Sequence, residues 1–486
     1  MKKEIIVLLF SYLGIILGFF NTVYKAKVFS TEELGLVTIF FSIILILSHC
    51  ANAGVPHILL KFSSSFKERK NKNGFLVFFA IVSILTNLIV ITIFYLARKI
   101  VYSYYQNPLV EENFYYILLL TFTTSTLMIY DTMCRVTHKE VVGDFFSNFL
   151  IKLLHFFLLV FLFFYHTSVS IYFLIYFIFM LLCIVSLIII LLKKGDLSNP
   201  NLKDIRKNNV IKYFKYGFFL FVGFFAGTLV FQIDRLMIGS MIGLEEAGIY
   251  GISVQLCMLL SIIPQAFSKV QMPQISLFLN EGNLPKLKQL YTNNLEAQLY
   301  IGLFIYTVFI FFVDKVLLLI GKDFTNGKIT FYLVFTGVLF NLLSGMSGEI
   351  AALSEYYKFD FYSKVILAIQ IIALNYILIP YFGVEGAALG TLINYIIYSL
   401  IKISFIYKKF GILPYKLSNL LYINAITPIV VILAMLNYMI DLSIYTIPFI
   451  GFLLFIFYDL ILLYFGKKDM VFTLKFYELF KKRFYT

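Results

Sequence analysis

The sequence contains no tryptophan, little charge and few cysteines. Only 14% of its 486 residues are charged, whereas 61% are hydrophobic. A water-soluble fold cannot bury so large an apolar fraction. The cysteines lie scattered within or beside apolar runs, a distribution that fits neither a disulfide framework nor a metal site. They are Cys50, Cys134, Cys183 and Cys257.

The chain also lacks the motifs of enzymes and pumps. It has no Walker-type phosphate-binding loop, which excludes a primary ATP-driven pump within this chain. Its five histidines are dispersed, and no Ser-His-Asp arrangement is recognisable. The polar segments are too short for a catalytic domain. We therefore predict a protein that is not an enzyme, carries no cofactor and binds no metal.

Long apolar runs are what the chain does contain. They are long enough to cross a hydrocarbon layer of roughly 30 Å as helices. The first run, from Ile5, is followed by no small-residue cleavage site, so we predict a retained span. The pattern predicts an all-α polytopic membrane protein with about fourteen spans. They are 5–24, 35–59, 75–97, 114–134, 143–165, 171–192, 214–240, 247–275, 295–313, 329–352, 361–379, 384–406, 419–438 and 444–465.

The net charge of +14 comes from basic clusters between the spans, as in "KFSSSFKERKNKNG" (61–74) and the tail from Lys467. RNA and anionic lipid are conceivable partners for such clusters. Their alternation along the chain instead follows the positive-inside rule. We therefore predict cytoplasmic N- and C-termini, contact with membrane lipids and no nucleic-acid binding.

An internal repeat divides the chain. The segment "STEELGLVTI" (30–39) aligns with "GLEEAGIYGI" (243–252), 213 residues later, and pairs Glu32 with Glu245, Glu33 with Glu246 and Gly35 with Gly248. Six spans separate the copies, so both enter the membrane in the same direction. Such parallel repeats are related by an axis along the membrane normal.

The repeat predicts two six-helix lobes related by a pseudo-two-fold axis, followed by two appended helices. The N-terminal lobe comprises 1–195, a cytoplasmic linker 196–213, and the C-terminal lobe 214–410. Residues 411–486 hold helices 13 and 14 and a basic cytoplasmic tail.

The paired acids of the repeat could serve function or cap helices. Ser30 and Glu33 form a capping-box pattern at the start of a span, and Glu245 and Glu246 lie where a helix dipole favours anions. We therefore expect two matched helical hairpins at the external face.

Two further stretches resemble a known family. "FQIDRLMIGSMIGLEEAGIYGISVQL" (231–256) and "LNYILIPYFGVEGAALGTLINYIIYSL" (374–400) look like signatures of the polysaccharide transporters, the Wzx-type O-antigen and capsule flippases of the MOP superfamily. The resemblance covers roughly residues 1–410.

The resemblance implies a bacterial cytoplasmic (inner) membrane protein that moves a polyprenyl-pyrophosphate-linked oligosaccharide to the outer leaflet by alternating access. The product would serve O-antigen (lipopolysaccharide), capsule or exopolysaccharide synthesis, with the polymerase machinery as a further partner. A proton- or sodium-coupled multidrug antiporter is the alternative, because that class shares the fold.

Anionic cargo requires cations in a polar cavity, and charges within spans normally face an interior or a partner. Arg235 is therefore the first substrate-binding candidate. The repeat places Asn21 at the position of Asp234, and Lys25 and Lys27 could complete a cationic rim. Neighbouring side chains on a helix diverge by about 100°, so Asp234 should orient the rim rather than neutralise Arg235. Snorkelling at the span ends is the alternative for these cations.

Further charged candidates lie in other spans. Lys152, with His155 three residues later, is a cavity candidate in span 5; a membrane-edge lysine and a packed histidine are the alternatives. Lys269 serves the site or marks a cytoplasmic span end. Coupling to H⁺ or Na⁺ would need a carboxylate within the membrane, and Glu349 and Asp131 are the candidates.

Overall fold

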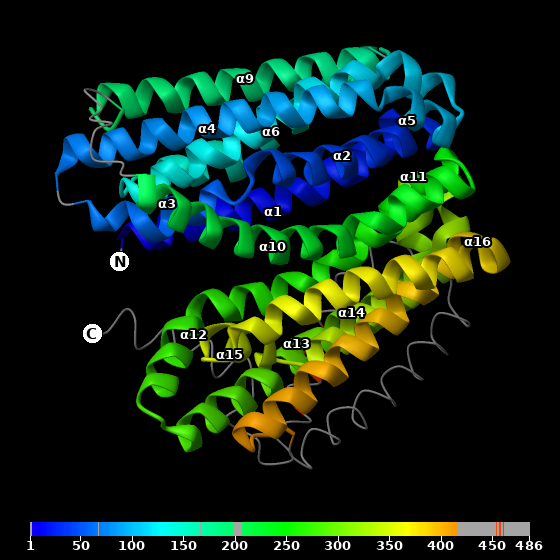
Figure 1. Ribbon diagram of the computed structural model, residues 1–486. Coiled ribbons are helices and arrows are strands. Elements are labelled where there is room, and N and C mark those ends of the chain that lie inside the picture. The colour runs from blue at the N-terminus through cyan, green and yellow to red at the C-terminus, as the bar shows by residue number, and fades with distance from the viewer. Residues whose placement is uncertain are drawn as a thin grey trace. The chain divides into compact units, whose positions relative to one another are not determined.

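The computed structural model describes residues 2–66, 68–165, 167–197 and 207–415, with Leu453, Ile456, Phe457 and Leu460. Its regular elements are all helical, which confirms the predicted all-α fold (Figure 1). Residues 198–206, half of the predicted linker 196–213, lie outside the described residues, as do predicted span 13 and, apart from those four residues, predicted span 14.

The helices follow one another in this order: α1 (Lys2–Val28), α2 (Thr31–Asn52), α3 (Val55–Phe62), α4 (Arg69–Leu96), α5 (Arg98–Tyr105), α6 (Pro108–Val136), α7 (Glu140–Asp144), α8 (Ile151–Tyr165), α9 (Val169–Lys193), α10 (Lys207–Met241), α11 (Leu244–Cys257), α12 (Ile262–Asn280), α13 (Leu284–Ile320), α14 (Lys328–Leu343), α15 (Ser347–Leu353) and α16 (Tyr357–Phe410). A π-helical turn, Phe145–Leu150, joins α7 to α8.

Ten helices in the described part of the chain are long and apolar enough to cross a membrane, or eleven if the bent pair within α13 counts as one span. On α4 the side chains of Ile81, Leu85, Ile89 and Ile93 are between 48% and 62% exposed. Their spacing of four residues places them on one helical face. An apolar face open to this extent suits lipid rather than water.

Two predicted spans contain breaks. Span 2 (35–59) is two helices, because Ala53 and Gly54 have left-handed backbones with φ of 45° and 80°. Such a conformation ends an α-helix, and Pro56 in the first turn of α3 suits a new start. Spans 11 and 12 run together as α16, with a non-helical Gly383 at the predicted boundary.

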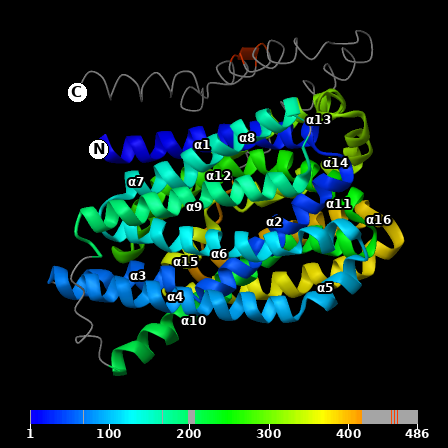
Figure 2. The same ribbon diagram turned by 90° about the horizontal axis from the view of Figure 1, so that it is seen from above.

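The helices form two compact units. Unit 1 comprises Met1–Ile252 and Lys364–Ala387, and unit 2 comprises Ser253–Ser363 and Ala388–Thr486. Within unit 1, α2 packs against α4, α6 and α10, and α1 lies beside α8 (Figure 2). The grouping departs from the predicted lobe boundary because α10 packs on α2 and α3. The two-fold relation between lobes stays a prediction.

Unit 1 is held by aromatic packing and by buried hydrogen bonds between helices. Phe40 of α2 stacks on Phe173 of α9, with ring centroids 5.3 Å apart. Asn52 accepts hydrogen bonds from Ser83 (3.3 Å) and Ser125 (2.9 Å). In lipid the hydrophobic effect between helices is weak, so such packing and polar contacts supply the association.

Unit 2 is also held by aromatic packing and by hydrogen bonds between helices. The ring centroids of Phe331 and Phe335 of α14 lie 4.8 Å apart, and both side chains are fully buried. The Tyr291 hydroxyl of α13 donates to the Ser344 carbonyl over 2.9 Å. This bond holds the turn between α14 and α15 against α13.

Candidate functional site

The two charges of the "QIDR" stretch on α10 face different partners. Asp234 is buried and accepts hydrogen bonds from the Tyr250 hydroxyl (2.8 Å) and the Asn375 amide (2.7 Å). Arg235 instead donates from Nη1 to Gln232 Oε1 over 2.7 Å. A helical step of about 100° between neighbours produces this divergence.

Gln232 connects Arg235 to α2. Its Oε1 also accepts a hydrogen bond from Ser42 Oγ at 2.9 Å. The amide oxygen therefore holds the guanidinium on the α2 side of α10. Neither Gln232 nor Ser42 was predicted as a site residue, although Gln232 is the first residue of the QIDR stretch that contains Arg235.

Lys25 lies in the last turn of α1 and is partly buried. Its ammonium interacts electrostatically with Arg235 and with His155. Both predicted cavity cations belong to unit 1. Lys27 is exposed two residues further along the same turn.

The Asn21 side chain contacts the backbone of Lys152. The Asn21 amide donates to the Lys152 carbonyl over 2.9 Å, and Asn21 is buried. Asn21 therefore ties α1 to α8, while the Lys152 side chain remains partly buried beside this joint. This contact assigns Asn21 a role in packing.

His155 is surrounded by tyrosines of α9. Its Nε2 lies 2.9 Å from the Tyr172 hydroxyl, and its ring centroid lies 5.0 Å from that of Tyr176. Both His155 and Tyr172 are buried. This environment matches the packed histidine that the sequence left open as an alternative.

The two candidate coupling carboxylates, Asp131 and Glu349, belong to different units of the fold. Asp131 of α6 pairs with Arg135 at 2.8 Å and accepts a hydrogen bond from Ser147 at 3.2 Å. Glu349 of α15, in unit 2, accepts a short hydrogen bond from Ser268. The side chain of Lys269, on the same helix as Ser268, lies outside the described part of the structure.

The buried cation Lys402 was not predicted from the sequence. Lys402 of α16 donates to Asn341 Oδ1 at 3.2 Å, and its ammonium lies 4.0 Å from the centre of the Tyr398 ring. It lies near a predicted span end, where lysines usually reach the interface. Burial was therefore not evident from position alone.

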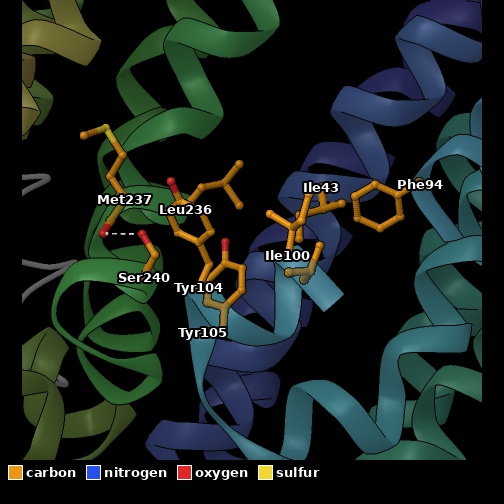
Figure 3. Close-up of a pocket in the computed structure, with 9 residues that line it drawn as sticks. Ile43, Phe94, Ile100, Tyr104, Tyr105, Leu236, Met237 and Ser240 are labelled. Atoms are coloured by element: carbon orange, nitrogen blue, oxygen red, sulfur yellow. Dashed lines mark hydrogen bonds between the residues drawn. The ribbon is translucent and has the colours of Figure 1, made fainter. Parts of the chain in front are cut away.

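An apolar cavity of about 270 Å³ opens beside α10 (Figure 3). Its walls come from α2, α4, α5 and α10, with Leu236, Met237 and Ser240 on the α10 side. Arg235 does not line it. The lining of the cavity therefore suits a hydrocarbon chain.

In the residues that the structure describes, no cluster of three or more His, Cys, Asp or Glu side chains could hold a metal ion. The side chains around Arg235 offer positive charge and hydrogen-bonding groups.

Comparisons with known proteins identify the family. The model of the family described as "Polysaccharide biosynthesis protein" matches residues 1–278. The chain belongs to this family. The capsular polysaccharide biosynthesis protein CapF of Staphylococcus aureus is 23% identical to this chain over 214 residues. The match covers 43% of this chain and 54% of CapF, so it spans about half the length of that relative.

Solved structures agree on the fold. The lipid II flippase MurJ, in an inward closed conformation, matches with a TM-score of 0.77 at 16% identity, covering 96% of this chain and all of MurJ. An inward-facing multidrug resistance MATE transporter of the MOP superfamily matches with a TM-score of 0.70 at 12% identity, covering 84% and 98%. The chain therefore has the fold of these two membrane transporters. This member of the polysaccharide biosynthesis protein family is a multi-pass membrane protein, as predicted.

Proposed function

We propose that this transporter moves polyprenyl-pyrophosphate-linked oligosaccharide repeat units from the inner to the outer leaflet of the bacterial cytoplasmic membrane. The family match, the CapF relative and the likeness to a lipid II flippase support a lipid-linked cargo. The product would feed O-antigen, capsule or exopolysaccharide synthesis.

The observation that carries the proposal is the Arg235 guanidinium, which Gln232 holds within a membrane-spanning helix of a polysaccharide biosynthesis protein. A charged side chain within a transmembrane helix is costly and normally faces an interior or a partner. A pyrophosphate would be a suitable partner, bound by Arg235 through its planar fork and by Lys25 as a point charge. Gln232 holds the guanidinium in place.

Alternating access supplies the movement. The headgroup and sugars would enter a polar cavity while the polyprenyl tail stays in lipid, and closure on one side would open the other. In the proposed orientation both termini are cytoplasmic, in accordance with the basic clusters. The polymerase machinery would receive the product, and H⁺ or Na⁺ coupling would involve Glu349 or Asp131.

Deletion of the gene in its native host tests the proposal. Surface polysaccharide and lipid-linked repeat units on the cytoplasmic side are measured together. We expect loss of polymer and accumulation of the intermediate, both reversed by the wild type and by the exposed-lysine control Lys99→Ala, but not by Arg235→Ala. Normal polymer together with heightened sensitivity to cationic dyes would favour a multidrug antiporter instead.

A further inference from the structure

The short helix α5 lies between two cavities of opposite chemistry in unit 1. One is the apolar cavity described above, to whose wall α5 contributes Ile100, Val101, Tyr104 and Tyr105. The other is a pocket of about 440 Å³ at the turn from α5 to α6, which we call the polar pocket. The polar pocket is lined by Tyr102, Ser103, Gln106, Asn107, Pro108 and Glu111.

The two linings lie on opposite sides of α5. Successive residues of an α-helix are rotated by about 100°, so the four cavity residues form one face and Tyr102, Ser103 and Gln106 form the face roughly opposite. The helix is therefore amphipathic, as are helices that lie in a membrane interface. In the proposed orientation it follows the external end of α4.

The apolar cavity is continuous with the lipid-facing surface of α4. Ile93 ends the exposed apolar face of that helix, and Leu96 (72% exposed) and Ile100 (61% exposed) continue the apolar surface onto α5. Ile100 itself belongs to the cavity wall, and three residues of α10 form the opposite wall (Figure 3). A hydrocarbon chain that enters from the lipid therefore meets mainly apolar side chains.

The polar pocket offers groups that bind sugars. The Tyr102 ring packs edge-on against Phe114, with centroids 5.4 Å apart. Gln106 donates through Nε2 to the Ser103 carbonyl at 3.2 Å, which leaves its Oε1 as an acceptor. Glu111 is exposed and adds a carboxylate. Aromatic rings pack on the C–H faces of sugars, and amide and carboxylate oxygens accept hydrogen bonds from sugar hydroxyls.

Asn107 fixes the turn that carries the polar pocket. Its Oδ1 accepts a hydrogen bond from the Leu109 amide at 2.9 Å, and its Nδ2 donates to Glu32 Oε1 of α2 at 2.7 Å. Gln106 has a left-handed backbone with φ of 45°, which turns the chain from α5 towards α6. A ligand would therefore meet a preorganised turn and would lose less of its binding energy to ordering it.

Charge distinguishes a sugar from a phospholipid headgroup at the polar pocket. Its six lining residues include one carboxylate, Glu111, and no cation, so the lining favours neutral hydroxyls over phosphate. The helical period places Arg98, in the first turn of α5, at the boundary between the two faces. Its guanidinium lies over the Tyr95 ring at 4.3 Å and interacts electrostatically with Tyr102. A phosphate that joins an apolar chain to a sugar suits this boundary.

We propose that α5 is an external binding site for the lipid-linked oligosaccharide after transport. The end of the polyprenyl chain nearest the headgroup occupies the apolar cavity, and the first sugars occupy the polar pocket. The inference rests on the proposed function for the identity of the cargo, but it assigns a second site that does not include Arg235. Each part of this amphipathic ligand meets matching chemistry on one side of the same helix.

The sequence contains no tryptophan, so a single introduced tryptophan reports on the cavity. Phe94→Trp places it in the cavity wall of the purified full-length protein, which also carries Arg235→Ala to remove the pyrophosphate contact proposed above. A spin-labelled polyprenol should quench this tryptophan saturably. Phe164→Trp on α8, where the native side chain is 71% exposed, should show only unsaturable quenching by probe dissolved in the lipid.

A cavity-filling variant and a competing lipid test the apolar part. Ser240→Phe should weaken polyprenol binding at least about tenfold, the effect of roughly 1.4 kcal/mol. Ser186→Phe on α9, outside the cavity lining, is the matched control. Unlabelled polyprenyl phosphate should displace the probe, whereas phosphatidylglycerol at the same concentration should not. Equal displacement by phosphatidylglycerol would make the cavity a general lipid site and overturn the proposal.

The polar part is tested with the free oligosaccharide, released by mild acid from the lipid-linked repeat unit of the native host. It should change the fluorescence of Tyr102→Trp. Glu111→Gln should weaken its binding about tenfold, as expected for a hydrogen bond to a charged group. Glu112→Gln removes the same charge one residue later, outside the pocket lining, and should bind like the parent protein.

The intact lipid-linked oligosaccharide joins the two tests. Its affinity should fall with Ser240→Phe and with Glu111→Gln, whereas polyprenol should respond only to the first and the free oligosaccharide only to the second. If either substitution leaves the affinity of the intact ligand unchanged, the two-part site is overturned. If Ser240→Phe fails to fold, the lipid competition at Phe94→Trp decides.

Failure of this inference differs from failure of the proposed function. Normal polysaccharide in the deletion strain would refute the proposed function, while the binding measurements on the purified protein would still report on α5. Loss of polymer in that strain, with neither probe bound at α5, would support transport and overturn the external site.

Discussion

The Asn375 amide donates a hydrogen bond to Asp234 over 2.7 Å, so a segment 141 residues away in the chain holds the buried carboxylate of α10. Tyr250 of α11 donates to the other carboxylate oxygen at 2.8 Å. Asp234 thus joins three helices. Both of its carboxylate oxygens accept hydrogen bonds from other helices.

This arrangement predicts that Tyr250→Phe and Asn375→Leu each lower the free energy of unfolding by about 1.5–3 kcal/mol, the range for hydrogen bonds to charged groups. In an Asp234→Asn protein, the same substitutions should cost less, because the charged acceptor is gone. Thermal unfolding of the purified proteins in detergent measures these differences in the free energy of unfolding. Additive effects of the substitutions would contradict the shared acceptor.

A second prediction concerns His155. Because the Tyr172 hydroxyl lies 2.9 Å from its Nε2 and both residues are buried, His155→Ala should leave a hydroxyl without its partner. We expect a loss of about 1–3 kcal/mol in stability. Polysaccharide synthesis per folded molecule should remain at the wild-type level. A selective loss of transport at unchanged melting temperature would return His155 to the binding site.

A third prediction concerns pH. Lys139 lies between α6 and α7 and pairs with Asp196. Burial, together with the nearby cations Arg69, Lys194 and Lys72, lowers its pKa from the usual value. Between the folded and unfolded pKa values, the unfolded chain binds more protons, so stability should rise as pH rises through that alkaline window.

The pH test uses melting temperatures from pH 7 to about pH 10, near the pKa of a free lysine. Lys139→Met should remove part of the alkaline rise. Asp196→Asn should lower stability at neutral pH, because the cations then repel without an anion between them. Added salt should recover part of that loss by screening. A fall in wild-type stability over the window would contradict the assignment.

Apolar runs predicted the helices well because lipid tolerates little else. They could not predict the break at Ala53 and Gly54, since a left-handed residue inside an apolar run leaves hydropathy unchanged. The motif around Arg235 identified a charged pair, and the helical period predicted that its members diverge. Their partners Tyr250 and Asn375 are far away in sequence, and only tertiary packing selects them.

The repeat carried more information than its few identities suggested. It predicted two matched hairpins, and the Ser30–Glu33 capping box is present. It did not predict that the hairpins contact each other, because an internal repeat shows that two segments are equivalent but not that they lie close together. Lys402 was missed for a related reason: position near a span end does not distinguish a snorkelling lysine from one buried against Asn341.

The final prediction concerns Lys25 and Arg235, the two cations proposed to bind the pyrophosphate. Binding of polyprenyl pyrophosphate to the purified protein should weaken about 10- to 100-fold in Arg235→Ala, equivalent to the 1.5–3 kcal/mol of a charge-assisted hydrogen bond. Arg235→Lys should recover only part, because an ammonium cannot form the bidentate fork.

Removal of both cations tests whether they share one anion. If they do, the loss in the Lys25→Ala, Arg235→Ala protein should differ from the sum of the single losses, because each substitution also relieves the repulsion felt by the other. Affinity should fall with added salt in the wild type and less steeply in the variants. Lys99→Ala should bind like the wild type. If Arg235→Ala also binds like the wild type, the pyrophosphate lies elsewhere and the pair serves another purpose.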